Sequence, residues 1–278
     1  MHGKRALPRF IVRLAAALIL VGALLVGIVI FSTYRVGVTE VELEIAHLPE
    51  ELDGLRVLHL TDWHNPSPER VHVDVLGALD DREFDLVCLT GDLVDSDVGQ
   101  LGPVIEVLEQ LGQRAPVVSV LGNHDWYAGG AHILDQLRRA GIITLENASA
   151  SIPAHGVPVT VVGISDHFSG RDDVAGAFSG VEEPFVLAIT HDPRIFPGIA
   201  SRGPSLVLAG HTHGGQIRLP FLPTQYAPGG GILPRFGDGL YRDGDSFLYV
   251  SRGIGYTGTL PFRFWNRPEI TLLTLRRR

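Results

Sequence analysis

Residues that can ligate divalent metal ions occur in five separate groups along the chain. These groups are Asp62-x-His64, Gly91-Asp92-x-x-Asp95, Gly122-Asn123-His124, His191 and Gly210-His211-x-His213. Each follows an apolar run that is typical of a buried strand. Because the carboxyl ends of strands line the ligand crevice in α/β sheets, we expect these side chains to converge on one point.

The donor set consists of oxygen and imidazole without thiolate. The single cysteine, Cys88, lies within the apolar run 86–89 and is expected in the core. Such a set suits manganese, iron(II), cobalt or zinc over a structural cysteine-type zinc site. It is too large for one tetrahedral ion and fits two ions that share a bridging carboxylate. The seven candidate ligands are Asp62, His64, Asp92, Asn123, His191, His211 and His213.

The elements that position these residues alternate between strands and helices in the first half of the chain. Strand patterns cover residues 40–45, 55–60, 86–90, 117–121, 159–164, 185–190, 206–209, 247–251 and 270–275. Apolar residues at helical spacing mark 71–79, 104–111 and 133–137. We expect one α/β domain of two packed sheets flanked by helices, with a long functional loop at 220–245.

Residues 14–34 form an uncharged, apolar run of 21 residues. As a helix this run would be roughly 31 Å long, close to the ~30 Å hydrocarbon core of a bilayer. A cleaved signal peptide is the alternative, but no A-x-A-like cleavage site precedes Arg35. We therefore expect residues 1–36 to form a cytoplasmic stub with a transmembrane anchor, and 37–278 to form the catalytic domain.

Charge sets the expected orientation and excludes one class of partner. Lys4, Arg5, Arg9 and Arg13 precede the apolar run and Arg35 follows it, so the positive-inside tendency places the body outside the cytoplasm. Residues 40–278 carry 18 basic and 31 acidic residues, a net charge of −13. An acidic body argues against a nucleic-acid partner, which would need a basic face.

The five groups, read as D-x-H, G-D-x-x-D, G-N-H-D, H and G-H-x-H, resemble the calcineurin-like metallophosphoesterase superfamily over residues 55–216. The tail, with Ser251-Arg252-Gly253-Ile254-Gly255 and Pro261-Phe262-Arg263, is similar to membrane-anchored bacterial members. Those members include relatives of the UDP-2,3-diacylglucosamine pyrophosphatase of lipid A synthesis. The resemblance implies a four-layer αββα sandwich and two divalent metal ions, with manganese favoured and iron, zinc or cobalt as alternatives.

The resemblance also implies a role for each site residue. Asp62, His64 and His213 would hold one ion. Asn123, His191 and His211 would hold the other, and Asp92 would bridge both. His124 would be the catalytic histidine and Asp95 would orient it, whereas Asp125 stands where many relatives have Glu and is given no role.

The leading hypothesis is a phosphoesterase at the bacterial inner membrane that cleaves a phosphodiester or pyrophosphate bond of a lipid-linked or envelope substrate. We expect a monomer. Cleavage of UDP-2,3-diacylglucosamine is a narrower alternative, but its cytoplasmic substrate conflicts with an outward-facing body. A non-catalytic metal-binding scaffold is the hypothesis from another class, and the presence of His124 with all seven ligands argues against it. A protein phosphatase is disfavoured by the anchor.

The sequence contains two further, weaker patterns. Gly253-x-Gly255-x-x-Gly258 formally matches a dinucleotide fingerprint, but no βαβ unit follows it, so we expect a turn near the active site. Six arginines are candidates for contact with a substrate phosphate, of which one or two are expected to make it: Arg171, Arg194, Arg218, Arg235, Arg252 and Arg263.

Overall fold

The computed structural model of the chain describes residues 8–64, 75–227, 231–257 and 261–278. Residues 71–74 of the first expected helix, the stub before residue 8 and Gly258 lie outside the described residues. Residues 75–79 are helical, as the apolar spacing predicts.

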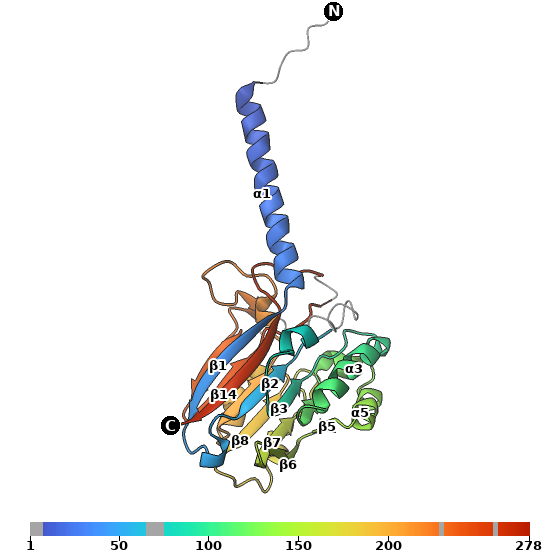
Figure 1. Cartoon of the computed structure of the whole chain (residues 1–278), viewed down its shortest axis with the longest axis vertical. Helices are drawn as coiled ribbons and strands as arrows, with labels where there is room; N and C mark the ends of the chain where they lie inside the picture. The colour runs from blue at the N-terminus through green and yellow to red at the C-terminus, as the bar shows by residue number, and fades with distance from the viewer. Residues whose placement is uncertain (1–7, 65–74, 228–230, 258–260) are drawn as a thin grey trace, which may run out of the picture.

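Two six-stranded sheets form the centre of the described structure (Figure 1). The first has the order β1-β14-β2-β3-β4-β5, in which β2 to β5 run parallel and β14 is antiparallel to β2. Its strands are β1 (Gly37–Ile45), β14 (Glu269–Arg277), β2 (Arg56–Leu60), β3 (Leu86–Thr90), β4 (Val117–Val120) and β5 (Ile143–Thr144).

The second sheet has the order β12-β13-β9-β8-β7-β6, with a parallel centre and antiparallel strands at both edges. Its strands are β12 (Gly239–Asp243), β13 (Ser246–Val250), β9 (Leu206–Ala209), β8 (Val186–Thr190), β7 (Val157–Ile164) and β6 (Ala148–Ala154). A separate ribbon pairs β10 (Tyr226–Ala227) with β11 (Gly231–Ile232).

Three apolar cores separate four layers, which confirms the αββα sandwich. The central core lies between the sheets and contains Val57, Cys88 and Leu208. The outer face of the first sheet packs on helices through residues such as Leu108 and Leu134. The outer face of the second packs on helices through Phe196. The helical elements are α3 (Leu101–Gly112), α4 (Asn123–Tyr127), α5 (Gly130–Arg139), α6 (Val174–Ala177), α7 (Phe196–Ala200), η1 (Glu50–Leu52), η2 (Val98–Gln100), η3 (Pro193–Ile195) and η4 (His213–Gly215).

Helix α1 (Arg9–Tyr34) stands away from the sandwich (Figure 1). Its 26 residues are about 39 Å long. Among the described residues it is the one helix that is long and apolar enough to cross a membrane. Only its last turn is buried, at Ser32 and Thr33.

The strand register places α1 at the end of the sheet where the candidate ligands lie. The start of β1, directly after α1, pairs Gly37 with Glu269 at the start of β14. Because β14 is antiparallel to β2, Thr271 pairs with His59 near the carboxyl end of β2. The helix and the carboxyl ends of the parallel strands therefore share one end of the molecule.

Residues 220–245, expected to be a loop, are partly β structure. The edge strand β12 within this segment pairs with β13, and the ribbon of β10 and β11 lies before it. Strand β12 is mostly exposed at the sheet edge, so it lacks the apolar alternation that marks a half-buried strand. Strand β6 was missed for the same reason, because its outer residues are mostly exposed.

Candidate active site

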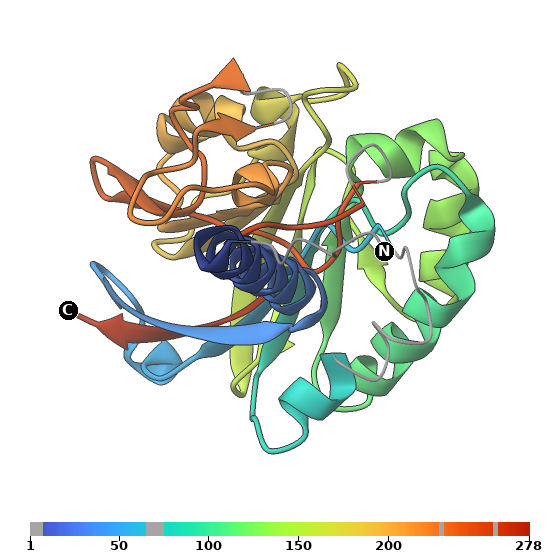
Figure 2. The same ribbon diagram turned by 90° about the horizontal axis from the view of Figure 1, so that it is seen from above.

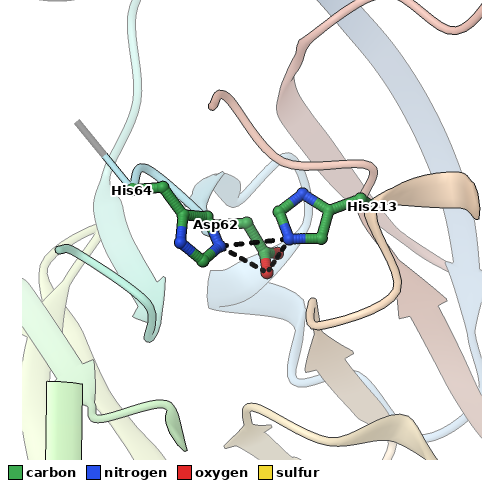
Figure 3. Close-up of side chains that lie close together, drawn as sticks. All are labelled: Asp62, His64 and His213. Atoms are coloured by element: carbon green, nitrogen blue, oxygen red, sulfur yellow. Dashed lines mark hydrogen bonds and ion pairs between the residues drawn. The ribbon is translucent and has the colours of Figure 1, made fainter. Parts of the chain in front are cut away.

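The first ligand group consists of Asp62, His64 and His213, and all three side chains are buried (Figure 3). The Nε2 atoms of His64 and His213 lie 3.1 Å apart. Oδ1 of Asp62 lies 3.5 Å from Nε2 of His213 and 4.0 Å from Nε2 of His64. Two imidazole nitrogens and a carboxylate oxygen thus point at one position, as a metal ion requires.

The second group consists of Asp92, His191 and His211, which are also buried. Nε2 of His191 lies 3.1 Å from Oδ2 of Asp92 and 3.1 Å from Nδ1 of His211. Nδ1 of His191 donates to the carbonyl oxygen of Thr90 at 2.7 Å. That hydrogen bond occupies Nδ1 with a proton, so Nε2 is the ring atom of His191 that would bind an ion.

Asp92 connects the two groups. Its Oδ2 lies 3.1 Å from Nε2 of His191 and 3.5 Å from Nε2 of His64 in the first group. Its Oδ1 accepts a hydrogen bond from the backbone N–H of His124 at 2.9 Å. A Cβ on Gly122 would lie 2.2 Å from that same oxygen, so only glycine allows this approach.

Unpaired buried atoms test whether the site fits metal ions. Within the described chain, Oδ1 of Asn123 and Nε2 of His211 are buried without a hydrogen-bond partner. A buried polar atom without a partner costs free energy, and an ion would relieve this cost at Asn123. Asn123 follows Gly122 and precedes His124, which both contact Asp92. The residues present therefore fit divalent metal ions.

Backbone strain is concentrated at the candidate ligand residues. Non-glycine residues with positive φ are uncommon and occur preferentially at functional sites, where the surrounding structure holds them. Five of the seven candidate ligands have φ between 47° and 69°: Asp62, His64, Asp92, His211 and His213.

His124 and Asp95 lie beside the first group. Nδ1 of His124 donates to the backbone carbonyl of Asp95 at 2.6 Å. The Asp95 carboxylate lies 3.5 Å from that nitrogen and 3.4 Å from Nδ1 of His64. The orientation expected from Asp95 thus comes mainly through its backbone, while its carboxylate faces two rings. His124 is part-exposed, unlike the buried ligands, so substrate can reach it.

The charges of the buried groups suit cation binding. Burial opposes ionisation of Asp92, but His191 and His64 outweigh it and hold the pKa of Asp92 well below its usual range. Burial, together with His191, lowers the pKa of His211 to about 3, and burial with His64 and Arg263 lowers that of His213. Metal binding requires an ionised carboxylate and neutral imidazoles, a state that Asp92, His211 and His213 already have. Burial opposes protonation of His191 and His64, but Asp92 outweighs it at His191, and Asp95 with Asp92 outweighs it at His64, so the pKa values of both rings are raised. An ion would therefore displace a proton from each of these two rings.

Asp125 holds the loops of the site, a role that the sequence did not reveal. Its carboxylate accepts hydrogen bonds from the backbone N–H groups of Leu93, Val94 and Gly122. These bonds join the loop after β3 to the loop after β4. Burial and the nearby Asp92 raise the pKa of Asp125 to about 7. No local pattern distinguishes a carboxylate that binds backbone amides from one that binds an ion.

The glycine motif forms a turn against the site, as expected. Gly253 has φ +71°, and a Cβ there would lie 2.4 Å from Cβ of Asp62. The backbone N–H groups of Ile254 and Gly255 donate to the carbonyls of Thr61 and Asp62. This turn therefore fixes the backbone that carries the first group.

Arg263 has a structural position and does not face a substrate. Its side chain is fully buried, and it donates to the carbonyl oxygens of Arg252, Gly253, Gly255 and His213. Asn266 donates to the His213 carbonyl as well, at 2.6 Å. Both residues support the loop of His213, and neither was predicted to do so.

The other five arginines also have protein partners. Arg194 pairs with Asp192, Arg218 with Asp238 and Arg252 with Glu269. The guanidinium of Arg171 lies over the Trp126 ring and that of Arg235 over Phe236. Phe168, which no pattern indicated, lies against the His211 ring with 5.3 Å between the ring centroids. It is 44% exposed and lies at the edge of the second group.

The family model described as calcineurin-like phosphoesterase matches residues 55–215. The chain belongs to this family, and it is therefore a phosphoester hydrolase of a class that works with divalent metal ions. The matched range includes all seven candidate ligands together with Asp95 and His124.

Three relatives illustrate the family. "Uncharacterized metallophosphoesterase YkoQ" of Bacillus subtilis is 31% identical and covers 78% of this chain and 82% of its own. "Phosphodiesterase YaeI" of Escherichia coli is 30% identical and covers 83% and 86%. "Transmembrane protein with metallophosphoesterase domain" of Danio rerio is 32% identical over 94% of this chain, which spans 62% of that relative.

Proposed function

We propose that this protein is a membrane-anchored phosphoesterase that uses two divalent metal ions, manganese before iron, zinc or cobalt, to cleave a phosphodiester or pyrophosphate bond. Asp62, His64 and His213 hold one ion in this proposal. Asn123, His191 and His211 hold the other, and Asp92 belongs to both. The position of Oδ2 of Asp92, 3.5 Å from His64 and 3.1 Å from His191, is the observation that carries the proposal.

Two divalent cations held by these residues would neutralise negative charge on the phosphoryl oxygens and lower the pKa of a water molecule. The residues around them supply orientation and a proton. His124 binds the Asp95 carbonyl through Nδ1–H, which leaves Nε2 free to carry the second proton of the ring. A positioned imidazolium is a common general acid, so His124 can pass this proton to the leaving oxygen.

The substrate that we propose is lipid-linked or belongs to the cell envelope. The register of β1, β14 and β2 supports it, because the candidate ligands lie at the end of the domain from which α1 emerges. A substrate in or on the bilayer would meet the site directly. We take residues 37–278 as the catalytic domain, acting as a monomer.

We further propose that the anchor crosses the bacterial inner membrane once with the domain on the outer side. The four basic residues before the apolar run of residues 14–34, Lys4, Arg5, Arg9 and Arg13, support this orientation. UDP-2,3-diacylglucosamine pyrophosphatase activity, with a place in lipid A synthesis, is the narrower alternative. It requires a cytoplasmic domain, so a protease-protection assay on intact spheroplasts separates the two possibilities.

The test is hydrolysis by the purified full chain in detergent, loaded with manganese. We expect cleavage of bis(p-nitrophenyl) phosphate that chelator abolishes and manganese restores. Lipid phosphodiesters and nucleotide-sugar pyrophosphates then define the substrate class. Failure to cleave any phosphoester after loading with each of the four metals would overturn the proposal.

A further inference from the structure

Large apolar side chains are exposed together in the segment that follows the His213 loop. Phe221 is fully exposed and Ile232 is 82% exposed. We call this set the apolar rim: Ile217, Leu219, Phe221, Leu222, Tyr226, Ile232, Leu233 and Trp265. Scattered single apolar residues are normal on a protein surface, but a concentration of this kind marks a contact with a partner or a membrane.

The rim lies next to the last turn of α1. Ile217 forms a β-bridge with Phe264, and the N–H of Arg218 donates to the Phe264 carbonyl at 3.0 Å. The N–H of the next residue, Trp265, donates to Oγ of Ser32 in α1 at 3.1 Å. Figures 1 and 2 show the orange loops of this region close beside the base of α1.

The same segment leads directly to the first ligand group. Gln216, at the start of the segment, donates through its side chain to the Phe262 carbonyl at 3.1 Å. Arg263 and Asn266, on either side of the Phe264 bridge, hold the carbonyl of His213. The rim, the end of α1 and the His213 loop of the first ligand group therefore lie at one end of the domain.

Charge favours a lipid surface as the occupant. Residues 217–236 include Arg218, which pairs with Asp238, and Arg235, whose guanidinium lies over the Phe236 ring, but no acidic residue, in a body whose net charge is −13. Basic residues among exposed apolar ones suit an anionic bilayer surface, and tryptophan is enriched at that interface. The direction of α1 places a bilayer next to the rim, whereas nothing comparable indicates a second copy of the chain.

We propose that the apolar rim inserts into the surface of the bilayer that α1 spans and holds the end of the domain that carries the candidate ligands against the lipid headgroups. A membrane phosphoester could then enter the site without leaving the bilayer. This consequence rests on the proposed phosphoesterase activity, whereas insertion of the rim rests only on the membrane anchor.

Insertion is tested by a Phe221→Cys variant of the full chain, labelled with an environment-sensitive dye. Cys88 is fully buried, so the dye reports on position 221 alone. The matched control is Glu51→Cys, at an exposed position in η1, which precedes β2. In vesicles of phosphatidylethanolamine and phosphatidylglycerol, a lipid-borne quencher should remove most emission at 221 and leave emission at 51 unchanged.

Equal exposure of both positions to a water-soluble quencher would overturn the proposal. Protection at 221 in detergent that rises with protein concentration would also overturn it, because it would assign the rim to a second copy. A second variant, Phe221→Asp, should lower hydrolysis of a vesicle-embedded phosphoester about tenfold, since the transfer of this side chain into lipid is lost. Its hydrolysis of soluble bis(p-nitrophenyl) phosphate should be unchanged.

These measurements separate the two proposals. If no phosphoester is cleaved but position 221 is quenched from the lipid, the proposed function fails and the rim stands. If the soluble ester is cleaved but position 221 stays in water, the rim fails and the proposed function stands.

Discussion

The two candidate ligand groups are supported by different parts of the molecule. Nδ1 of His191 in the second group binds the carbonyl of Thr90 at the end of β3, so the sheet core holds it. His213 in the first group depends on Arg263 and Asn266. The backbone N–H of Arg263 in turn donates to Oγ1 of Thr33 in α1 at 2.9 Å. The second group is thus anchored in the core, whereas the first is linked to helix α1.

Removal of the Asp92 carboxylate should impair both ligand groups equally, because it faces both of them. Asp92→Ala deletes the oxygen that faces both, so we expect loss of most bound metal and of detectable turnover. Metal content by mass spectrometry and hydrolysis of bis(p-nitrophenyl) phosphate measure both effects. Asp135→Ala, at an exposed surface pair with Arg139, is the control and should behave like wild type. A variant at Asp92 that retains both ions would contradict a bridging role.

Loss of His124 should separate chemistry from metal binding. His124→Ala removes the proton donor but no proposed ligand, so turnover should fall roughly 10²–10⁴-fold. Metal content should stay at the wild-type value. Purified His124→Ala with wild-type turnover would refute the role as an acid.

Substitution of Asp95 should have a smaller effect on turnover than loss of His124, and its effect on metal affinity should be confined to the first group. Its carboxylate faces the Nδ1 atoms of both His64 and His124. Asp95→Asn keeps the backbone carbonyl that orients His124 but removes the charge, so turnover and affinity for the first ion should fall roughly 10–100-fold. Titration of the apoprotein with manganese should show one weakened site. Weakening of both sites to the same extent would count against the separation of the groups.

Arg263 tests the link between the first group and the segment that contacts α1. Arg263→Met leaves buried carbonyls without a donor, so we expect a loss of roughly 1–3 kcal/mol in stability. The affinity for the ion of the first group should again be the one that falls. Arg242→Met, at an exposed position on β12, is the matched control for thermal unfolding and metal titration. Unaltered affinity at both sites would show that the segment does not support the ligands.

His59 in β2 is a buried histidine that is not a candidate ligand. Burial lowers its pKa to about 3 from 6.5 in the unfolded chain. Below pH 6.5 the unfolded chain binds a proton that the folded chain does not, so stability falls as the pH drops from 6.5 towards 3. In this pH range, unfolding of His59→Asn should take up about one proton fewer than unfolding of the wild-type protein. Urea unfolding of the metal-free protein, with chelator present, over a pH series measures this proton uptake as the slope of the unfolding free energy against pH. The same slope in the wild type and in His59→Asn would contradict a neutral buried His59.

The sequence indicated the seven candidate ligands because each follows a buried strand, and continuous apolar runs mark these strands clearly in this chain. Strand β3 was predicted with its bounds, and β1 with its exposed glutamates. Short edge elements were missed, since β12 and β6 bury too little apolar surface to leave a pattern.

The supporting residues could not be predicted for a different reason. Arg263 contacts backbone carbonyls 8 to 50 positions away in the sequence. Such contacts depend on where the chain brings backbone atoms together, which residue type and spacing do not encode. For the same reason a buried structural arginine was counted among six possible phosphate ligands.

The most direct test of the shared Asp92 is the position of the metal ions. Anomalous diffraction from crystals of the manganese-loaded full chain would locate them. We predict two peaks, one among Asp62, His64 and His213 and the other among Asn123, His191 and His211, with the Asp92 carboxylate between them. A single peak, or a second ion bound away from Asp92, would contradict the account.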